Sequence, residues 1–205
     1  MSEAGRPHVF VAGRADVPPL LLLHGTGGNE HDLIPLAKQL AVNAPLLSPR
    51  GTVSENGMAR HFRRLAEGVF DEDDLRARVD ELADFVLAAQ DEEGITPGSW
   101  HAVGFSNGAN IASAMLLRRP EMLAGAVLIA AMVPFRDPGQ GDLTGKRVAV
   151  VNGRHDPMAP LEQTEVLVRQ LRDRGAEVVQ IPHDGGHTVD VALIPQMRDF
   201  LRGVS

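Results

Sequence analysis

Short apolar runs recur along the chain, separated by glycine, proline and polar residues. Seven of these runs predict β-strands, at residues 9–12, 20–23, 44–47, 100–105, 125–130, 148–151 and 178–181. Most are continuously apolar rather than alternating, which is typical of strands covered on both faces in a parallel sheet. We therefore expect helices to lie between the strands.

Apolar residues at helical spacing occupy the segments between these runs. The clearest example covers Leu75, Val79, Leu82 and Val86, which share one face, and acidic residues at 71–74 precede it, where a helix N-terminus favours negative charge. Weaker helical patterns lie at 32–40, 161–171 and 191–201, and 107–117 is apolar nearly all round, as in a buried helix. The alternation predicts an α/β fold with a mostly parallel central sheet and helices on both faces.

Residues 49–70 show neither the apolar pattern of a strand nor the spacing of a helix, which predicts a long, functional loop. The loop contains proline, glycine and asparagine and then a basic segment at residues 60–64. No repeat, low-complexity tract or linker is visible, and the loop is too short to join two separate cores. Residues 1–205 are therefore expected to form a single domain.

Composition narrows the function classes. The absence of cysteine excludes disulfide scaffolds, thiolate metal sites and cysteine nucleophiles. A net charge of −7 provides no general attraction for polyanions, so neither nucleic acid nor membrane is an expected partner. The N-terminus lacks the basic flank and apolar stretch of a signal peptide, which favours a cytoplasmic protein. The oligomeric state, monomer or homodimer, is left open.

The strongest chemical signal is Gly104-Phe105-Ser106-Asn107-Gly108. Alone, this G-x-S-x-G pattern fits an ordinary glycine-rich turn. Here an apolar strand precedes it and a helix follows, which is the setting of a nucleophile elbow. Such a turn presents the serine oxygen at a helix N-terminus, where developing negative charge is favoured. Ser106 is therefore the candidate nucleophile.

A second glycine-rich loop, residues 24–28, follows the strand predicted at 20–23. It lacks the Gly-Lys-Ser/Thr of a phosphate-binding loop, and Glu30 stands where a dinucleotide motif needs its third glycine. The loop is suited to donating a main-chain N–H, from Thr26, to an oxyanion. A tight turn without a ligand is the alternative, and His24 is expected to brace the loop.

A serine nucleophile needs a base and a group that orients the base. His187 follows two glycines just beyond the last predicted strand, at the sheet edge where Ser106 also lies. His183 is its competitor. Asp156 follows a predicted strand at the same edge and is the candidate acid, with an Asp-Pro turn as the plain alternative and Asp184 as its rival.

These motifs, in the order serine, aspartate, histidine, resemble the α/β-hydrolase fold family. The narrower likeness is to its small phospholipase/carboxylesterase branch, which includes acyl-protein thioesterases and bacterial hydrolases associated with hydroquinone resistance. The resemblance covers nearly the whole chain and depends on residues 23–30, 49–51, 104–109, 152–157 and 185–187.

The resemblance implies a set of roles. Ser106 would be the nucleophile, His187 the base and Asp156 its orienter, and the N–H groups of Thr26 and Asn107 would form the oxyanion hole. The family's usual glutamine after the nucleophile is here Asn107, but that role uses the main chain. Nothing of lid length follows the strand at 125–130, so we expect no large lid and no true lipase.

The expected reaction is acyl transfer from a small ester or thioester to water through an acyl-enzyme, with no cofactor. Two alternatives stay open: hydrolysis of a carbon–carbon bond in an aromatic ring-cleavage product, and a non-catalytic hydrolase-like protein that binds a ligand. A metal site at His183 and His187 is not expected, because two intervening glycines oppose the helix that would align them.

Four residues are candidates for substrate contact: Arg50, Arg60, Phe62 and Met158. Either arginine could bind a carboxylate or phosphate of the substrate in a bidentate manner. The plainer alternatives are that the loop arginines pair with the acidic residues at 71–74 and Glu67, and that the apolar side chains pack in the core.

Overall fold

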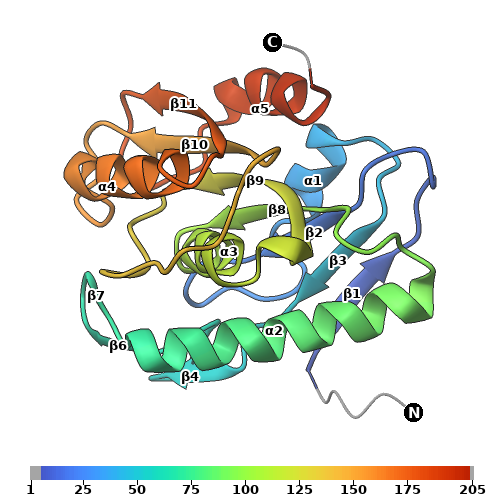
Figure 1. Cartoon of the computed structure of the whole chain (residues 1–205), viewed down its shortest axis with the longest axis horizontal. Helices are drawn as coiled ribbons and strands as arrows, with labels where there is room; N and C mark the ends of the chain where they lie inside the picture. Colours follow the sequence, from blue (N-terminus) through green and yellow to red (C-terminus); the bar gives the residue numbers. More distant parts are fainter. Residues whose placement is uncertain (1–5, 204–205) are drawn as a thin grey trace.

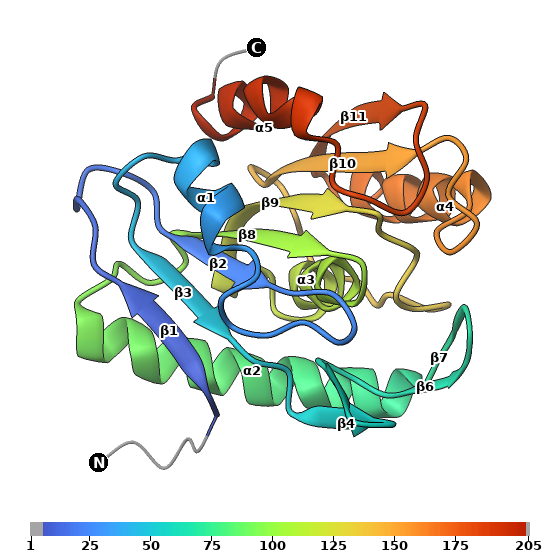
Figure 2. The same cartoon turned by 180° about the vertical axis from the view of Figure 1, so that it is seen from behind.

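A seven-stranded sheet forms the centre of the computed structural model, which describes residues 6–203 (Figures 1 and 2). Its strand order is β1-β3-β2-β8-β9-β10-β11. Only β1 is antiparallel to its neighbour within this sheet. The bounds are β1 (His8–Val11), β2 (Leu20–Leu23), β3 (Leu46–Pro49), β8 (Trp100–Phe105), β9 (Leu123–Ile129), β10 (Arg147–Gly153) and β11 (Glu177–His183). The predicted mostly parallel sheet is confirmed.

Helices cover both faces of the sheet (Figures 1 and 2). One face carries α2 (Glu72–Glu93), α3 (Asn107–Arg118) and α4 (Leu161–Arg172), and the other carries α1 (Ile34–Leu40) and α5 (Ile194–Leu201). Two 3₁₀ turns, η1 (Pro120–Met122) and η2 (Val191–Leu193), complete the regular elements on these faces in residues 6–203.

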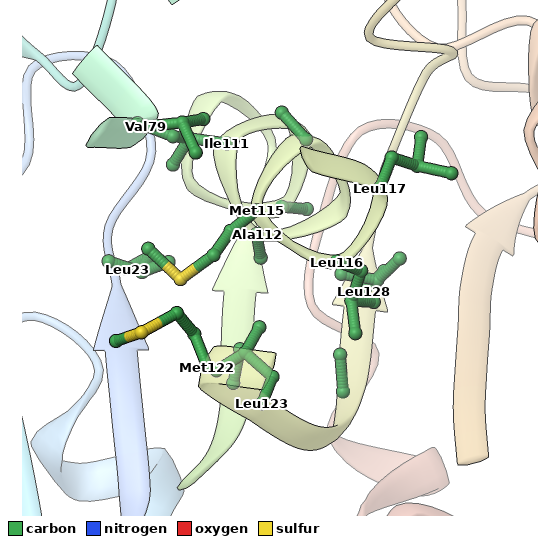
Figure 3. Packing of buried hydrophobic residues seen from close by; sticks show 14 of the residues in the cluster. Leu23, Val79, Ile111, Ala112, Met115, Leu116, Leu117, Met122, Leu123 and Leu128 are labelled. Atoms are coloured by element: carbon green, nitrogen blue, oxygen red, sulfur yellow. The ribbon is translucent and has the colours of Figure 1, made fainter. Parts of the chain in front are cut away.

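The strands are continuously apolar because helices cover both faces of the sheet, as the pattern predicted. In β2, Leu21 and Leu23 belong to the core beneath α2, α3 and α4, whereas Leu20 and Leu22 belong to the core beneath α1 and α5. Successive side chains of a strand point to opposite faces, so a strand covered on both sides must be apolar throughout. Figure 3 shows Met115 of α3 extending toward Leu23 between helix and sheet.

The interpretation of residues 49–70 as a loop without regular structure is wrong. The segment contains two hairpins, β4 (Val53–Glu55) with β5 (Met58–Arg60), and β6 (Arg64–Ala66) with β7 (Val69–Phe70). Strands of two or three residues are too short to display an alternating pattern, which is why periodicity missed them.

The topology gathers the candidate residues at one end of the sheet. The loops that follow the parallel strands β2, β8, β9, β10 and β11 leave the carboxyl edge, which is where α/β folds bind ligands. The connection from β9 to β10, residues 130–146, contains no helix or strand, in agreement with the expected absence of a large lid. No helix within residues 6–203 is both long and apolar enough to cross a membrane.

Candidate active site

Ser106 stands at the sharp turn between β8 and α3. Its backbone has φ 53° and ψ −117°, a conformation that costs a residue other than glycine about 1–3 kcal/mol. The neighbouring Gly108 has no room for a side chain, because a Cβ there would lie 1.9 Å from the carbonyl oxygen of Leu23. The second glycine of the motif therefore lets α3 start directly against the end of β2, with Ser106 at its tip.

A continuous chain of hydrogen bonds links Ser106 to His187 and Asp156. The Ser106 Oγ lies 2.8 Å from His187 Nε2, and His187 Nδ1 lies 2.7 Å from Asp156 Oδ2. The other carboxylate oxygen, Oδ1, accepts hydrogen bonds from the N–H groups of Met158 and Ala159 at 2.8 and 2.9 Å. The Asp156 carboxylate is therefore buried and held in one orientation, and the chain is suited to removing the proton of a serine hydroxyl.

The two loops that carry the acid and the histidine pack against each other. A Cβ at Gly153 would lie 2.3 Å from the carbonyl oxygen of Gly185, so the glycine at the end of β10 permits this contact. The N–H of His155 also donates to that oxygen at 3.1 Å. The contact brings Asp156 and His187 together although they are 31 positions apart in the sequence.

The rivals considered from the sequence have other partners. His183 Nδ1 accepts from the N–H of Gly185 at 3.2 Å and supports the turn before His187. Asp184 points to solvent with 89% of its side chain exposed and pairs with Arg154. In the described part of the chain, no group of three or more histidine, aspartate or glutamate side chains is arranged to hold a metal ion.

Thr26 and Asn107, whose main-chain N–H groups are the candidate oxyanion donors, line the same cavity as Ser106. Asn107 is the first residue of α3, where N–H groups have no partner within the helix. Thr26 is held on both sides by the β4–β5 hairpin. The N–H of Gly27 donates to the carbonyl of Ala59 at 2.9 Å, and Arg60 Nη1 donates to Thr26 Oγ1 at 2.7 Å.

The cavity beside Ser106 has a volume of about 40 Å³. A neighbouring cavity of about 230 Å³ shares Gly68 and Phe70 with it and extends toward Phe135. The first is lined by Thr26, Arg60, Arg64, Glu67, Gly68, Phe70, Ser106, Asn107, Asn110, Ala130, Met132, Met158 and His187. Two of the four candidate substrate residues, Arg60 and Met158, are therefore placed at the cavity.

The structure places the other two candidates elsewhere. Phe62 is fully buried in the core and packs edge-on against Phe70, because the apolar space beneath α2 accepts its ring. Arg50 lies outside the cavity lining and makes a bidentate pair with Glu30, at 2.5 and 2.8 Å. The plainer alternative, in which the loop arginines pair with residues 71–74, holds for Arg63, which pairs with Asp71.

Sequence reasoning missed several residues that shape the cavity. Asn110, one turn after Ser106, accepts a hydrogen bond from the N–H of Met132 at 2.8 Å and so holds the segment after β9 against the site. Ala130 in that segment has φ 54°, a second strained position beside Ser106. The available signal was the presence of asparagine inside the mostly apolar segment 107–117, because a buried polar side chain there needs a specific partner.

A model of the phospholipase/carboxylesterase family matches residues 5–205 of the chain. The chain belongs to this family. It is 45% identical over 195 residues to MhqD of Bacillus subtilis (strain 168), which is named as a hydrolase, covering 95% of this chain and 97% of that protein. The family resemblance seen in the sequence is therefore confirmed.

Solved structures agree with this assignment. The carboxylesterase of Bacillus cereus has a TM-score of 0.96 and 41% identity, covering 99% of this chain and 96% of that one. The structure of YahD with malic acid has a TM-score of 0.93 and 30% identity, covering 98% and 100%. These findings confirm the α/β-hydrolase fold and indicate an enzyme of the carboxylesterase class.

In this member of the phospholipase/carboxylesterase family, Asn107 also joins the elbow to the loop that starts after β3. Its side-chain Oδ1 accepts the main-chain N–H of His61 at 2.7 Å. The buried His61 ring packs 4.5 Å from the ring of His24, whose Nε2 accepts the N–H of Gly51 at 3.0 Å. A pair of buried histidines thus joins the two loops beside Asn107, with His24 as the expected brace.

This histidine pair makes stability depend on pH. Burial lowers the pKa of His24, and it holds the pKa of His61 well below 6.5. In the unfolded chain both rings take up a proton as the pH falls through about 6.5, whereas the folded protein resists protonation of His61. The contribution of the two histidines to the free energy of unfolding is therefore fully present above this pH and decreases below it.

Because only the unfolded chain readily protonates His61, we expect this residue to lower the free energy of unfolding between pH 7.5 and 5.5, by at most about 1.4 kcal/mol. Urea unfolding at the two pH values measures the loss, and His61→Leu should remove this share of it. His31→Leu makes the same change at an exposed side chain and serves as the control. An equal pH dependence in wild type and His61→Leu would contradict the assignment.

Proposed function

We propose that this protein is a serine hydrolase that cleaves small carboxylic esters through an acyl-enzyme. The observation that carries the proposal is the unbroken chain from Ser106 Oγ through His187 to Asp156, with both links shorter than 3 Å. Its residues lie at the carboxyl edge of the sheet, and Thr26 and Asn107, the proposed oxyanion donors, line the same cavity.

In the first half of the reaction, Ser106 Oγ attacks the ester carbonyl carbon while His187 Nε2 takes its proton. The carbonyl oxygen becomes negatively charged, and the N–H groups of Thr26 and Asn107 stabilise it. Protonated His187 then gives the proton to the leaving alcohol as the carbon–oxygen bond breaks. Asp156 keeps the ring in the required tautomer and stabilises its charged form.

In the second half, His187 removes a proton from water, which attacks the acyl carbon bound to Ser106. The intermediate collapses, the serine oxygen recovers the proton from His187, and a carboxylic acid leaves. Thioesters follow the same steps with a thiol as leaving group, and we propose them as a second substrate class. The small cavity beside Ser106 supports a short group next to the reacting carbon.

A fluorophosphonate probe tests the mechanism directly, because it phosphonylates only an activated serine. We expect intact-mass measurement to find one adduct on the wild-type protein and none on Ser106→Ala. A folded wild-type protein that takes no label would contradict the serine mechanism and favour a ligand-binding protein. A panel of esters of increasing acyl length, the matching thioesters and vinylogous diketones then ranks the substrate classes, including carbon–carbon bond cleavage.

A further inference from the structure

A buried arginine lies at the wall of the cavity beside Ser106. The side chain of Arg60 is only 4% exposed, and it is among the residues that line this cavity. Its Nε donates to the carbonyl of Phe62 at 3.1 Å, and Nη1 donates to Thr26 Oγ1 at 2.7 Å. Within residues 6–203, Nη2 has no hydrogen-bond partner. The guanidinium therefore retains donor capacity at the cavity.

The charge of this arginine is only partly neutralised. Glu55 is its ionic partner, at 3.2 Å, but the same carboxylate also accepts from Arg64 Nε at 2.9 Å. Arg64 lines the cavity as well. Two guanidinium groups thus share one carboxylate, which leaves a net positive charge. Glu67 also lines the cavity, but its side chain is exposed, so solvent screens its opposing charge.

Burial and the charge of Arg64 lower the pKa of Arg60 below its usual range, and Glu55 opposes this change. The group still stays protonated at neutral pH. A buried cation with an incomplete set of partners is costly, and an anion placed in the cavity would complete the set. A guanidinium group matches the geometry of a carboxylate or a phosphate, and a carboxylate is the one that a small carboxylic ester readily carries.

We propose that Arg60, assisted by Arg64, is a subsite for a carboxylate on the substrate, so that short monoesters of dicarboxylic acids are preferred over neutral esters. The inference rests on the proposed esterase function. Thr26 sets the reach, because its side chain accepts a hydrogen bond from Arg60 and its N–H is the proposed oxyanion donor. Together with a cavity of about 40 Å³, this places the second carboxylate close to the scissile carbonyl.

The competing explanation is that Arg60 only positions Thr26. A positioning role predicts that loss of Arg60 lowers turnover of all esters alike. A subsite predicts a selective loss for substrates that carry the carboxylate. The ratio of kcat/KM for an acidic and a neutral ester separates the two, because a general defect cancels in the ratio.

Monoethyl succinate and ethyl butyrate form a matched pair in which a carboxylate replaces a terminal methyl group, and a pH-stat follows both. We expect the wild-type enzyme to prefer monoethyl succinate. In Arg60→Gln the acidic-to-neutral ratio should fall at least about 10-fold, since a charge-assisted hydrogen bond is worth about 1.5–3 kcal/mol. Arg64→Gln should lower it less.

Arg63→Gln is the matched control. It makes the same change one residue from Arg64, at a side chain that is 63% exposed, paired with Asp71 and outside the cavity lining. Its ratio should equal that of the wild type. Glu55→Gln keeps both arginines and removes the carboxylate that they share, so its acidic-to-neutral ratio should rise. This variant tests the subsite even if Arg60→Gln does not fold. Ratios unchanged in the folded Arg60, Arg64 and Glu55 variants would overturn the subsite.

Binding without turnover separates this inference from the proposed function. Calorimetry with Ser106→Ala should detect binding of monoethyl succinate that weakens about 10-fold or more when Arg60→Gln is added. If wild-type protein lacks esterase activity but this binding is observed, the function fails and the subsite stands. If wild-type protein hydrolyses esters but the binding ignores Arg60, the subsite fails alone.

Discussion

Replacing Ser106 with alanine is expected to lower ester turnover by at least about 10³-fold while the protein stays folded. The substitution removes the hydroxyl oxygen that lies 2.8 Å from His187 Nε2, so the proposed acyl-enzyme could not form. Residual catalysis would come from the oxyanion donors of Thr26 and Asn107 and from substrate binding. Steady-state kinetics on a short ester, with circular dichroism and urea unfolding, measure both parts of the prediction.

The strained backbone of Ser106 supplies a control. Alanine and serine bear the same penalty at φ 53°, so Ser106→Ala should unfold at nearly the wild-type urea concentration. Glycine bears little of this penalty, so Ser106→Gly should be equally inactive and no less stable. Wild-type turnover by folded Ser106→Ala would show that another residue is the nucleophile.

Asp156→Asn is expected to lower turnover by about 10⁴-fold, the effect known for the corresponding change in the best-studied serine protease triad. The environment of the carboxylate explains why. Oδ1 accepts two main-chain N–H groups, so the amide oxygen of asparagine must take that position. The amide nitrogen then faces His187 Nδ1 and donates to it, which leaves a proton on Nε2. That tautomer cannot accept the proton of Ser106.

Asp184→Asn makes the same chemical change at the exposed rival carboxylate, which pairs only with Arg154 among the ion pairs within residues 6–203. Its turnover should remain within about twofold of the wild type, because an exposed pair contributes little. Parallel kcat measurements on the two variants decide between the carboxylates. A larger loss in Asp184→Asn than in Asp156→Asn would assign the acid role to Asp184.

The strands and helices of the central fold could be read from the sequence because each element is specified by its own residues. The apolar runs at 20–23 and 100–105 coincide with β2 and β8, and helical spacing located α2. The hairpins of residues 53–70 were not visible, because pairing across a hairpin, rather than a pattern within each strand, maintains strands this short.

The nucleophile elbow is likewise a local feature. The strand, the two glycines and the helix around Ser106 lie within one short segment, so the motif itself predicts the turn. The order of Ser106, Asp156 and His187 along the chain, together with the sheet topology that the strands imply, placed all three at one edge. The hydrogen bonds among them depend on tertiary contacts between residues as far as 81 positions apart, so the sequence could only lead us to expect them.

The sequence by itself thus determined the α/β class, the elbow and the candidates for acid and base, since apolar periodicity and glycine spacing act over a few residues. Only the tertiary structure decided that Asp156 rather than Asp184 faces His187, that Arg60 rather than Arg50 reaches the cavity, and that Phe62 packs in the core. The physical reason is that burial, and the choice of a partner for each charge, depend on segments that meet only after folding. Arg60 and Thr26, for example, are 34 positions apart and share a hydrogen bond.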